Sequence, residues 1–160
     1  MWTTSDRCGR SLSGGAALWH DPPVRIERKI EIARPVEEVF EFVADPRNDP
    51  RWCPKVQSVD GGGDRYEVVH KPVPLRPARR LEMRRVASDP PRRIEWTQDD
   101  GTDRFRVTYE LEPTATGTRF RQLSDAEIGA VPKPLHGLWR HGIGRDLQRQ
   151  LRQLKKLLES

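Results

Sequence analysis

The sequence predicts an α+β protein in which a curved antiparallel sheet wraps around one long C-terminal helix. Three observations support this expectation: a strand followed by a short helix, a series of short strands separated by turn residues, and a final amphipathic helix. Strands joined by short turns pair as antiparallel neighbours, and a single amphipathic helix must bury its apolar stripe against them. The 160 residues match the usual size of one domain.

The first 23 residues predict a flexible extension ahead of a domain formed by residues 24–160. The extension is rich in Ser, Gly, Thr and Pro and has no sustained hydrophobic period. From residue 24 to residue 32 apolar and charged side chains alternate, as in a half-buried strand, although Arg28 interrupts the apolar side. Pro35 then suits the first turn of a helix. Apolar side chains follow it at helical spacing: Val36, Val39, Phe40 and Val43.

Six more strands are expected between residues 56 and 123. Their approximate bounds are 56–59, 66–71, 80–86, 93–98, 104–112 and 118–123. Gly-rich, Pro-rich and Asp-Gly segments separate them, and these residues favour turns. The alternation is clearest from residue 105 to residue 111, so one face of the sheet is expected to pack and the other to face water.

A long helix is expected from the prolines at positions 132 and 134 to Leu158. Its apolar positions are Leu135, Leu138, Trp139, Ile143, Leu147, Leu151, Leu154 and Leu158. Gly142 and Gly144 lie near the middle of this helix. They predict either close packing of the helix on the sheet or space for a ligand beneath it.

The net charge of +5 is concentrated near the C-terminus. The last 28 residues hold seven Lys and Arg against two acids, which leaves 22 basic and 22 acidic residues in the rest of the chain. The pI of about 9.6 could indicate a nucleic-acid partner. Nucleic-acid-binding proteins present a broad basic surface or interleaved aromatic side chains, so we do not expect nucleic acid here.

No segment predicts a membrane span, a secretory signal or a cofactor site. There is no run of about 18 apolar residues, and the N-terminus lacks a basic start with an apolar stretch, so we expect a cytoplasmic protein. Cys8 and Cys53 are expected to be free thiols. Neither their spacing nor that of the four histidines matches a disulfide framework or a metal site.

Four stretches resemble the START-like (SRPBCC) helix-grip superfamily, which includes polyketide cyclases/dehydrases and lipid-transport domains. They are IERKIEIARPVEEVFEFVADPRNDPRWCP, SDPPRRIEWTQ, TGTRFRQ and LQRQLRQLKKLLE. The resemblance covers about residues 24–158 and implies an elongated cavity between the sheet and the C-terminal helix. Most members bind or transform apolar or polycyclic molecules there. The superfamily has no invariant catalytic motif, so the resemblance implies the fold more than an activity.

Strand parity predicts which side chains line this cavity. Residues two apart on a strand share a face, so polar side chains in step with apolar neighbours are expected to point inward. An apolar lining with a few polar groups is typical of small-molecule sites. The candidate ligand-binding residues are Arg28, Tyr66, Met83, Trp96, Gln98, Phe105, Phe120, Gln122, Trp139 and Ile143. In the alternative interpretation, the polar members lie at strand ends and reach solvent.

Three residues are candidates for acid–base chemistry. His70 is the one histidine on a predicted strand, and its ordinary pKa lies near neutrality. Tyr109 could donate a hydrogen bond to a carbonyl, and Arg85 could polarise a keto group. Each also has a structural alternative, as a core residue or as a side chain that reaches solvent.

Four cations recur along one side of the last helix: Arg145, Arg149, Arg152 and Lys156. They predict either a solvated face or a docking strip for an acidic carrier protein or an anionic surface. For the whole chain we expect binding or carriage of an apolar or aromatic small molecule. The alternatives are a cofactor-free enzyme of the polyketide cyclase/dehydrase kind and an interaction protein that acts through the basic helix.

Overall fold

The computed structural model describes residues 23–74, 77–129 and 131–160 and has the predicted α+β architecture. Seven strands form one antiparallel sheet in the order β1-β7-β6-β5-β4-β3-β2. The strands are β1 (Val24–Ile32), β2 (Val56–Gly62), β3 (Arg65–His70), β4 (Arg79–Asp89), β5 (Arg93–Asp99), β6 (Asp103–Thr114) and β7 (Gly117–Ile128). The predicted extension lies outside the described residues, apart from Pro23, and so does Cys8.

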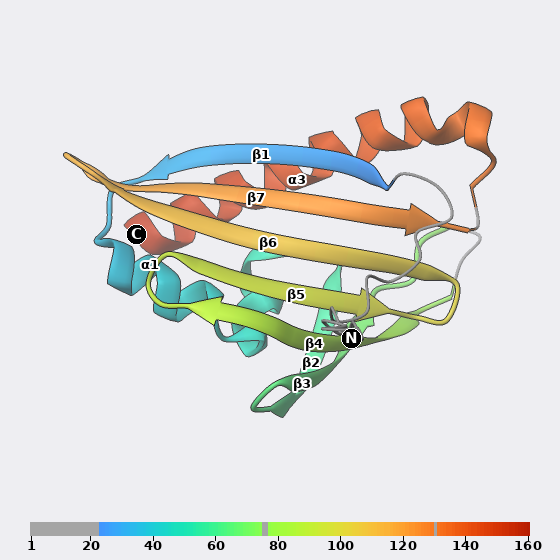
Figure 1. The fold of residues 1–160 in the computed structure, drawn as a ribbon, viewed down its shortest axis with the longest axis horizontal. Coiled ribbons are helices and arrows are strands. Elements are labelled where there is room, and N and C mark those ends of the chain that lie inside the picture. Colours follow the sequence, from blue (N-terminus) through green and yellow to red (C-terminus); the bar gives the residue numbers. More distant parts are fainter. Residues whose placement is uncertain (1–22, 75–76, 130) are drawn as a thin grey trace, which may run out of the picture.

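The helices lie on one face of the sheet (Figure 1). They are α1 (Val36–Val43), the short turns η1 (Pro46–Asn48) and α2 (Asp49–Trp52), the turn η2 (Lys133–Leu135), and α3 (His136–Glu159). Helix α3 contacts the edge strand β1 and helix α2. The sheet therefore curves over a single long helix, as the sequence predicts.

The core is built from the inner face of the sheet and the apolar sides of the helices. Its largest fully buried side chains include Trp52, Trp96 and Phe120. The Trp52 ring packs edge-on against Tyr109 and Phe120, with ring centroids 6.0 and 6.4 Å apart. The end of α3 closes the core through Leu147, Leu151 and Leu154. Burial of these side chains stabilises the fold by about 1.5–3 kcal/mol for each.

The apolar positions in the first turns of the predicted helix are packed less than those in its second half. Leu135 and Leu138 are 50% and 73% exposed, whereas Trp139 and Ile143 are half-buried. The spacing of leucines alone predicts an apolar side for the helix but not how far the sheet reaches along it. The sheet is also irregular at Val86, where a bulge in β4 leaves this side chain 51% exposed.

The two glycines in the middle of α3 have different surroundings. A side chain at Gly144 would overlap the Arg28 guanidinium, whose Nε donates a hydrogen bond to the Gly144 carbonyl over 3.1 Å. No described residue lies within 4 Å of the space that a side chain at Gly142 would occupy. At Gly144 the structure therefore shows close packing of the helix on β1.

This difference predicts unequal effects of two alanine substitutions. Gly142→Ala should stabilise the protein by about 1 kcal/mol, because alanine favours helix and meets no neighbour among the described residues. Gly144→Ala gains the same propensity, but it must displace the flexible tip of the Arg28 side chain and weaken its hydrogen bond to the Gly144 carbonyl, so its net gain should be smaller. Urea unfolding at pH 7 should therefore rank Gly142→Ala above Gly144→Ala. Equal stabilities of the two variants would contradict the described contact between Gly144 and Arg28.

Candidate ligand-binding site

The strand register brings the predicted inner-face residues together in rows. Tyr66, Met83, Gln98 and Phe105 pair in turn across β3, β4, β5 and β6. In the next rows Arg85 pairs with Trp96, and Tyr109 pairs with Gln122, which pairs with Arg28. Phe120 lies two residues before Gln122 and so on the same face. Trp139 and Ile143 are on α3, which covers this face.

Burial divides this face into a closed part and a partly open part. Met83, Trp96 and Phe120 are buried in the core, as are Tyr66 and Gln122. Gln98 and Phe105 are only half-buried, as are Trp139 and Ile143 on the helix. The side chains on and under the first half of α3 are therefore more exposed than those under its second half.

Two buried polar atoms on the inner face lack a hydrogen-bond partner among the described residues: the indole nitrogen of Trp96 and the amide oxygen of Gln122. Trp96 is 0% exposed and Gln122 is 4% exposed. The Gln122 amide nitrogen has one long contact, 3.4 Å to the Ser124 hydroxyl. An unsatisfied buried polar group costs about 1–3 kcal/mol, so a molecule that satisfied these atoms would gain affinity from them.

His70 lies at the end of β3, paired in register with Arg79, and is half-buried. Burial, together with the smaller effects of the Lys55 and Arg79 charges, lowers its pKa to about 4. The imidazole is therefore neutral at pH 7. A general base works best when its pKa lies near the working pH, so this environment does not favour acid–base catalysis by His70.

Tyr109 and Arg85 also have environments that limit their chemistry. Burial raises the pKa of Tyr109 well above its ordinary value, so its hydroxyl stays protonated and can act as a donor. The Arg85 guanidinium pairs with Asp64 over 2.9 Å and lies 6.0 Å from the centre of the Trp96 ring. Arg85 is thus on the predicted face, but its charge already has a partner.

A buried polar cluster beside Trp52 was not predicted from the sequence. Asp49 and Cys53 are 5% and 4% exposed, and the Gln150 side chain of α3 donates a hydrogen bond to the Cys53 sulfur over 2.9 Å. Burial raises the pKa of Asp49 to about 7 and raises that of Cys53 well above its ordinary value. The segment around Asp49 has the sequence of an exposed proline-flanked turn, and nothing in that pattern signals burial.

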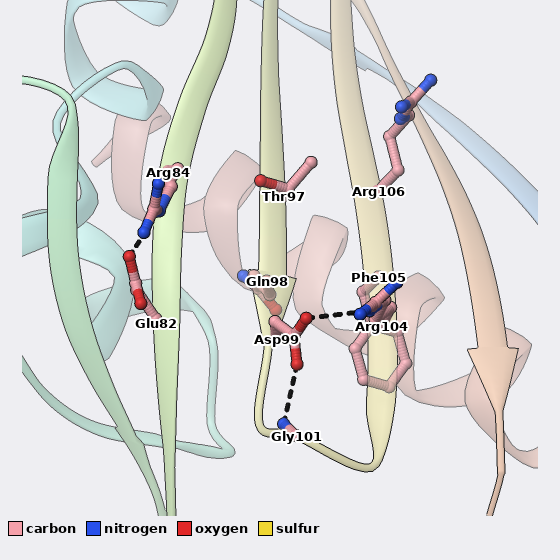
Figure 2. A pocket seen from close by; sticks show the side chains of 9 residues that line it. All are labelled: Glu82, Arg84, Thr97, Gln98, Asp99, Gly101, Arg104, Phe105 and Arg106. Carbon is pink, nitrogen blue, oxygen red and sulfur yellow. Dashed lines mark hydrogen bonds and ion pairs between the residues drawn. The ribbon is translucent and has the colours of Figure 1, made fainter. Parts of the chain in front are cut away.

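A pocket of about 420 Å³ lies at the ends of β4, β5 and β6. Figure 2 shows its lining, which is mostly charged: Glu82, Arg84, Thr97, Gln98, Asp99, Gly101, Arg104, Phe105 and Arg106. Asp99 accepts hydrogen bonds from Arg104 and from the Gly101 backbone, and Glu82 pairs with Arg84. Only Gln98 and Phe105 belong to the predicted inner face, so this pocket lies largely outside the apolar site.

Two kinds of feature are absent from the described ranges. No helix there is long and apolar enough to cross a membrane. No group of three or more His, Cys, Asp and Glu side chains in these ranges is arranged to hold a metal ion.

The antiparallel sheet curved over one long C-terminal helix defines a helix-grip, START-like protein. The chain belongs to the polyketide cyclase/dehydrase and lipid transport family, whose model matches residues 23–159. This match confirms the resemblance noted in the sequence. No curated protein matches the chain.

Solved structures share this fold at low sequence identity. A START superfamily protein from Mycobacterium smegmatis aligns with a TM-score of 0.70 and 15% identity, over 84% of this chain and 97% of that one. A protein from Chromobacterium violaceum aligns with a TM-score of 0.69 and 22% identity, over 86% of this chain and 99% of that one. The di-domain ARO/CYC StfQ of the steffimycin biosynthetic pathway aligns with a TM-score of 0.69 and 16% identity, over 88% of this chain and 52% of that chain. At such identities these likenesses show the fold alone.

Proposed function

We propose that the protein binds an apolar or aromatic small molecule, of the lipid or polyketide kind, between the inner face of the sheet and the first half of α3. The observation that supports this most is the pair of unpartnered buried polar atoms, Trp96 Nε1 and Gln122 Oε1, among aromatic and aliphatic side chains. A ligand would satisfy both atoms if its rigid apolar body carried a carbonyl oxygen to accept from the Trp96 indole N–H and a hydroxyl to donate to the Gln122 amide oxygen.

Carriage is favoured over catalysis by the state of two of the three candidate catalytic residues. Burial lowers the pKa of His70 to about 4, and the Arg85 guanidinium is paired with Asp64. The protonated hydroxyl of Tyr109 can act as a hydrogen-bond donor in either case. The alternative is an enzyme of the polyketide cyclase/dehydrase kind, as the family description allows. Turnover of a poly-keto substrate that is lost in His70→Ala and Arg85→Ala, with ligand affinity kept, would support that alternative instead.

The proposal also includes an acidic partner for the basic side of α3. Either an acidic carrier protein or an anionic surface would match the four exposed cations Arg145, Arg149, Arg152 and Lys156. Such a partner would donate or receive the bound molecule.

Tryptophan fluorescence titrations with palmitate, cholesterol and a hydroxyanthraquinone test the binding proposal. We expect at least one probe to saturate with about one molecule for each chain. In Gln122→Leu the affinity for the hydroxyanthraquinone should fall about 5- to 30-fold, because one hydrogen bond is lost, while its methoxy derivative should be unaffected. Folding should be retained, since the substitution removes an unsatisfied buried group.

Thr97→Val is the matched control, because Thr97 pairs with Arg84 and Arg106 in the rows of the opposite face. It should leave the affinity for all probes unchanged. If no probe saturates, or if both variants lose affinity equally, the proposed site is wrong.

A further inference from the structure

The four cations on the outer side of α3 have no ion-pair partner within residues 23–74, 77–129 and 131–160. Arg145, Arg149, Arg152 and Lys156 are all exposed, and among the residues that the structure describes none of their side chains makes an ion pair or a hydrogen bond. We call these four residues the basic stripe. Their charges are free to meet an external partner.

The arginines of the sheet behave differently. Arg25 pairs with Asp125 over 2.7 Å, Arg119 with Glu31 over 2.7 Å, and Arg104 with Asp99 over 2.9 Å. These pairs, and others like them, neutralise the outer face of the sheet. The excess positive charge of +5 therefore lies mainly on one side of α3.

The basic stripe continues into an exposed apolar residue. Leu138 precedes the four cations by 7, 11, 14 and 18 residues, which are close to whole numbers of turns at 3.6 residues for each turn. Leu138 is 73% exposed, and Leu135, about one turn earlier, is 50% exposed. From Leu138 to Lys156 this line is about 27 Å long at 1.5 Å for each residue.

We propose that the basic stripe and Leu138 dock α3 on an anionic lipid surface. The cations would lie against lipid phosphate groups, and Leu138 would enter the interface, as in other amphipathic helices that bind in the plane of a membrane. A straight line of evenly spaced cations fits a flat charged surface, and the exposed leucine gives it an apolar contact. The inference rests on the proposed function, because it names the acidic partner.

Docking in this geometry would place α3, which covers the proposed ligand site, against the lipid. Trp139 and Ile143, which partly cover that site, lie on the same half of α3 as Leu138. An apolar molecule could then pass between the lipid and the protein with little exposure to water.

Co-sedimentation of the full chain with phosphatidylcholine vesicles, with and without phosphatidylglycerol, tests the proposal. We expect binding only when phosphatidylglycerol is present, and a steep loss of binding as salt is added. The triple variant Arg145→Glu, Arg149→Glu, Arg152→Glu should bind at least about a hundredfold more weakly, since each cation near such a surface contributes about a fivefold factor. Leu138→Ser should weaken binding about fivefold and leave the salt dependence unchanged.

The matched control is Arg65→Glu, Lys71→Glu, Arg92→Glu. These residues are exposed and lie on or beside β3 and β5, and the variant has the same net charge as the stripe variant. It should bind vesicles within a few-fold of wild type, since its charges lie off the docking face. All substituted side chains are exposed, and circular dichroism should show that both variants are folded.

Three results would overturn the docking proposal. They are no phosphatidylglycerol-dependent binding by wild type, equal losses in the stripe and control variants, and binding of an acidic protein through the stripe without any vesicle binding. Titration of the same variants with the fluorescence probes separates this proposal from the ligand site. Vesicle binding without probe binding would reject the ligand site alone, whereas probe binding without vesicle binding would reject docking alone.

Discussion

At pH 8 the Asp49→Asn variant should be more stable than wild type by up to about 4 kcal/mol. Asp49 is 5% exposed, and burial raises the pKa of its carboxyl to about 7, a value that already includes smaller opposing effects of Trp52 and Lys55 and a small upward effect of Asp45. Among the described residues the Trp52 indole N–H has no hydrogen-bond partner of good geometry, so its effect on the Asp49 pKa is minor.

The sign follows from proton binding. Between pH 4 and pH 7 the folded state holds a proton on Asp49 that the unfolded state has released, so the free energy of unfolding falls as the pH rises. Asparagine keeps the shape of the side chain and cannot ionise. Urea unfolding should therefore show nearly equal free energies of unfolding for the variant and wild type at pH 4. From pH 4 to pH 8 the free energy of unfolding of the variant should increasingly exceed that of wild type. An unchanged difference between the two proteins would show that the carboxyl is not desolvated.

At pH 4 the His70→Gln variant should gain up to about 3 kcal/mol over wild type, relative to their difference at pH 7. Burial and the charges of Lys55 and Arg79 lower the pKa of His70 from 6.5 to about 4. Below pH 6.5 the unfolded state takes up a proton that the folded state excludes, so the contribution of His70 to stability is lost as the pH falls toward 4. Glutamine has no such transition.

The contributions of His70 and Asp49 oppose each other over almost the same pH range. Wild type should therefore show a shallow dependence of unfolding free energy on pH between 4 and 6.5, while each single variant shows a clear slope. The free energy of unfolding should rise with pH in Asp49→Asn and fall with pH in His70→Gln. NMR titration of the His70 ring protons is the independent check. A His70 pKa near 6.5 in the folded protein would contradict the predicted contribution of His70 to the pH dependence.

The fold was predictable because it depends on simple periodicities. Alternation along the strands fixes which side chains share a face, and the polar residues Arg28, Gln98 and Gln122 do lie in register with apolar neighbours. The strand bounds differ from the expected ones mainly by extension at strand ends, as in β7, which continues to Ile128. Hydrogen bonding to a neighbouring strand, which the sequence pattern does not contain, decides where a strand stops.

Other features depend on contacts that no local pattern contains. Asp49 is buried because α3 and β2 pack against α2, although its own segment resembles an exposed turn. Arg85 on β4 pairs with Asp64 in the β2–β3 turn. Gly144 lies against Arg28, on a strand more than a hundred residues earlier. Roles for the candidate site residues stay predictions, because they require a ligand to be identified.

The central claim is that the chain holds an apolar or aromatic molecule between its sheet and α3. Native mass spectrometry of the freshly purified protein, followed by solvent extraction and identification of what is released, tests it most directly. We predict a stoichiometric apolar adduct that is lost on denaturation and is retained less well by Gln122→Leu. A mass equal to that of the bare chain, together with no uptake of fatty acids, sterols or aromatic polyketides, would contradict the claim.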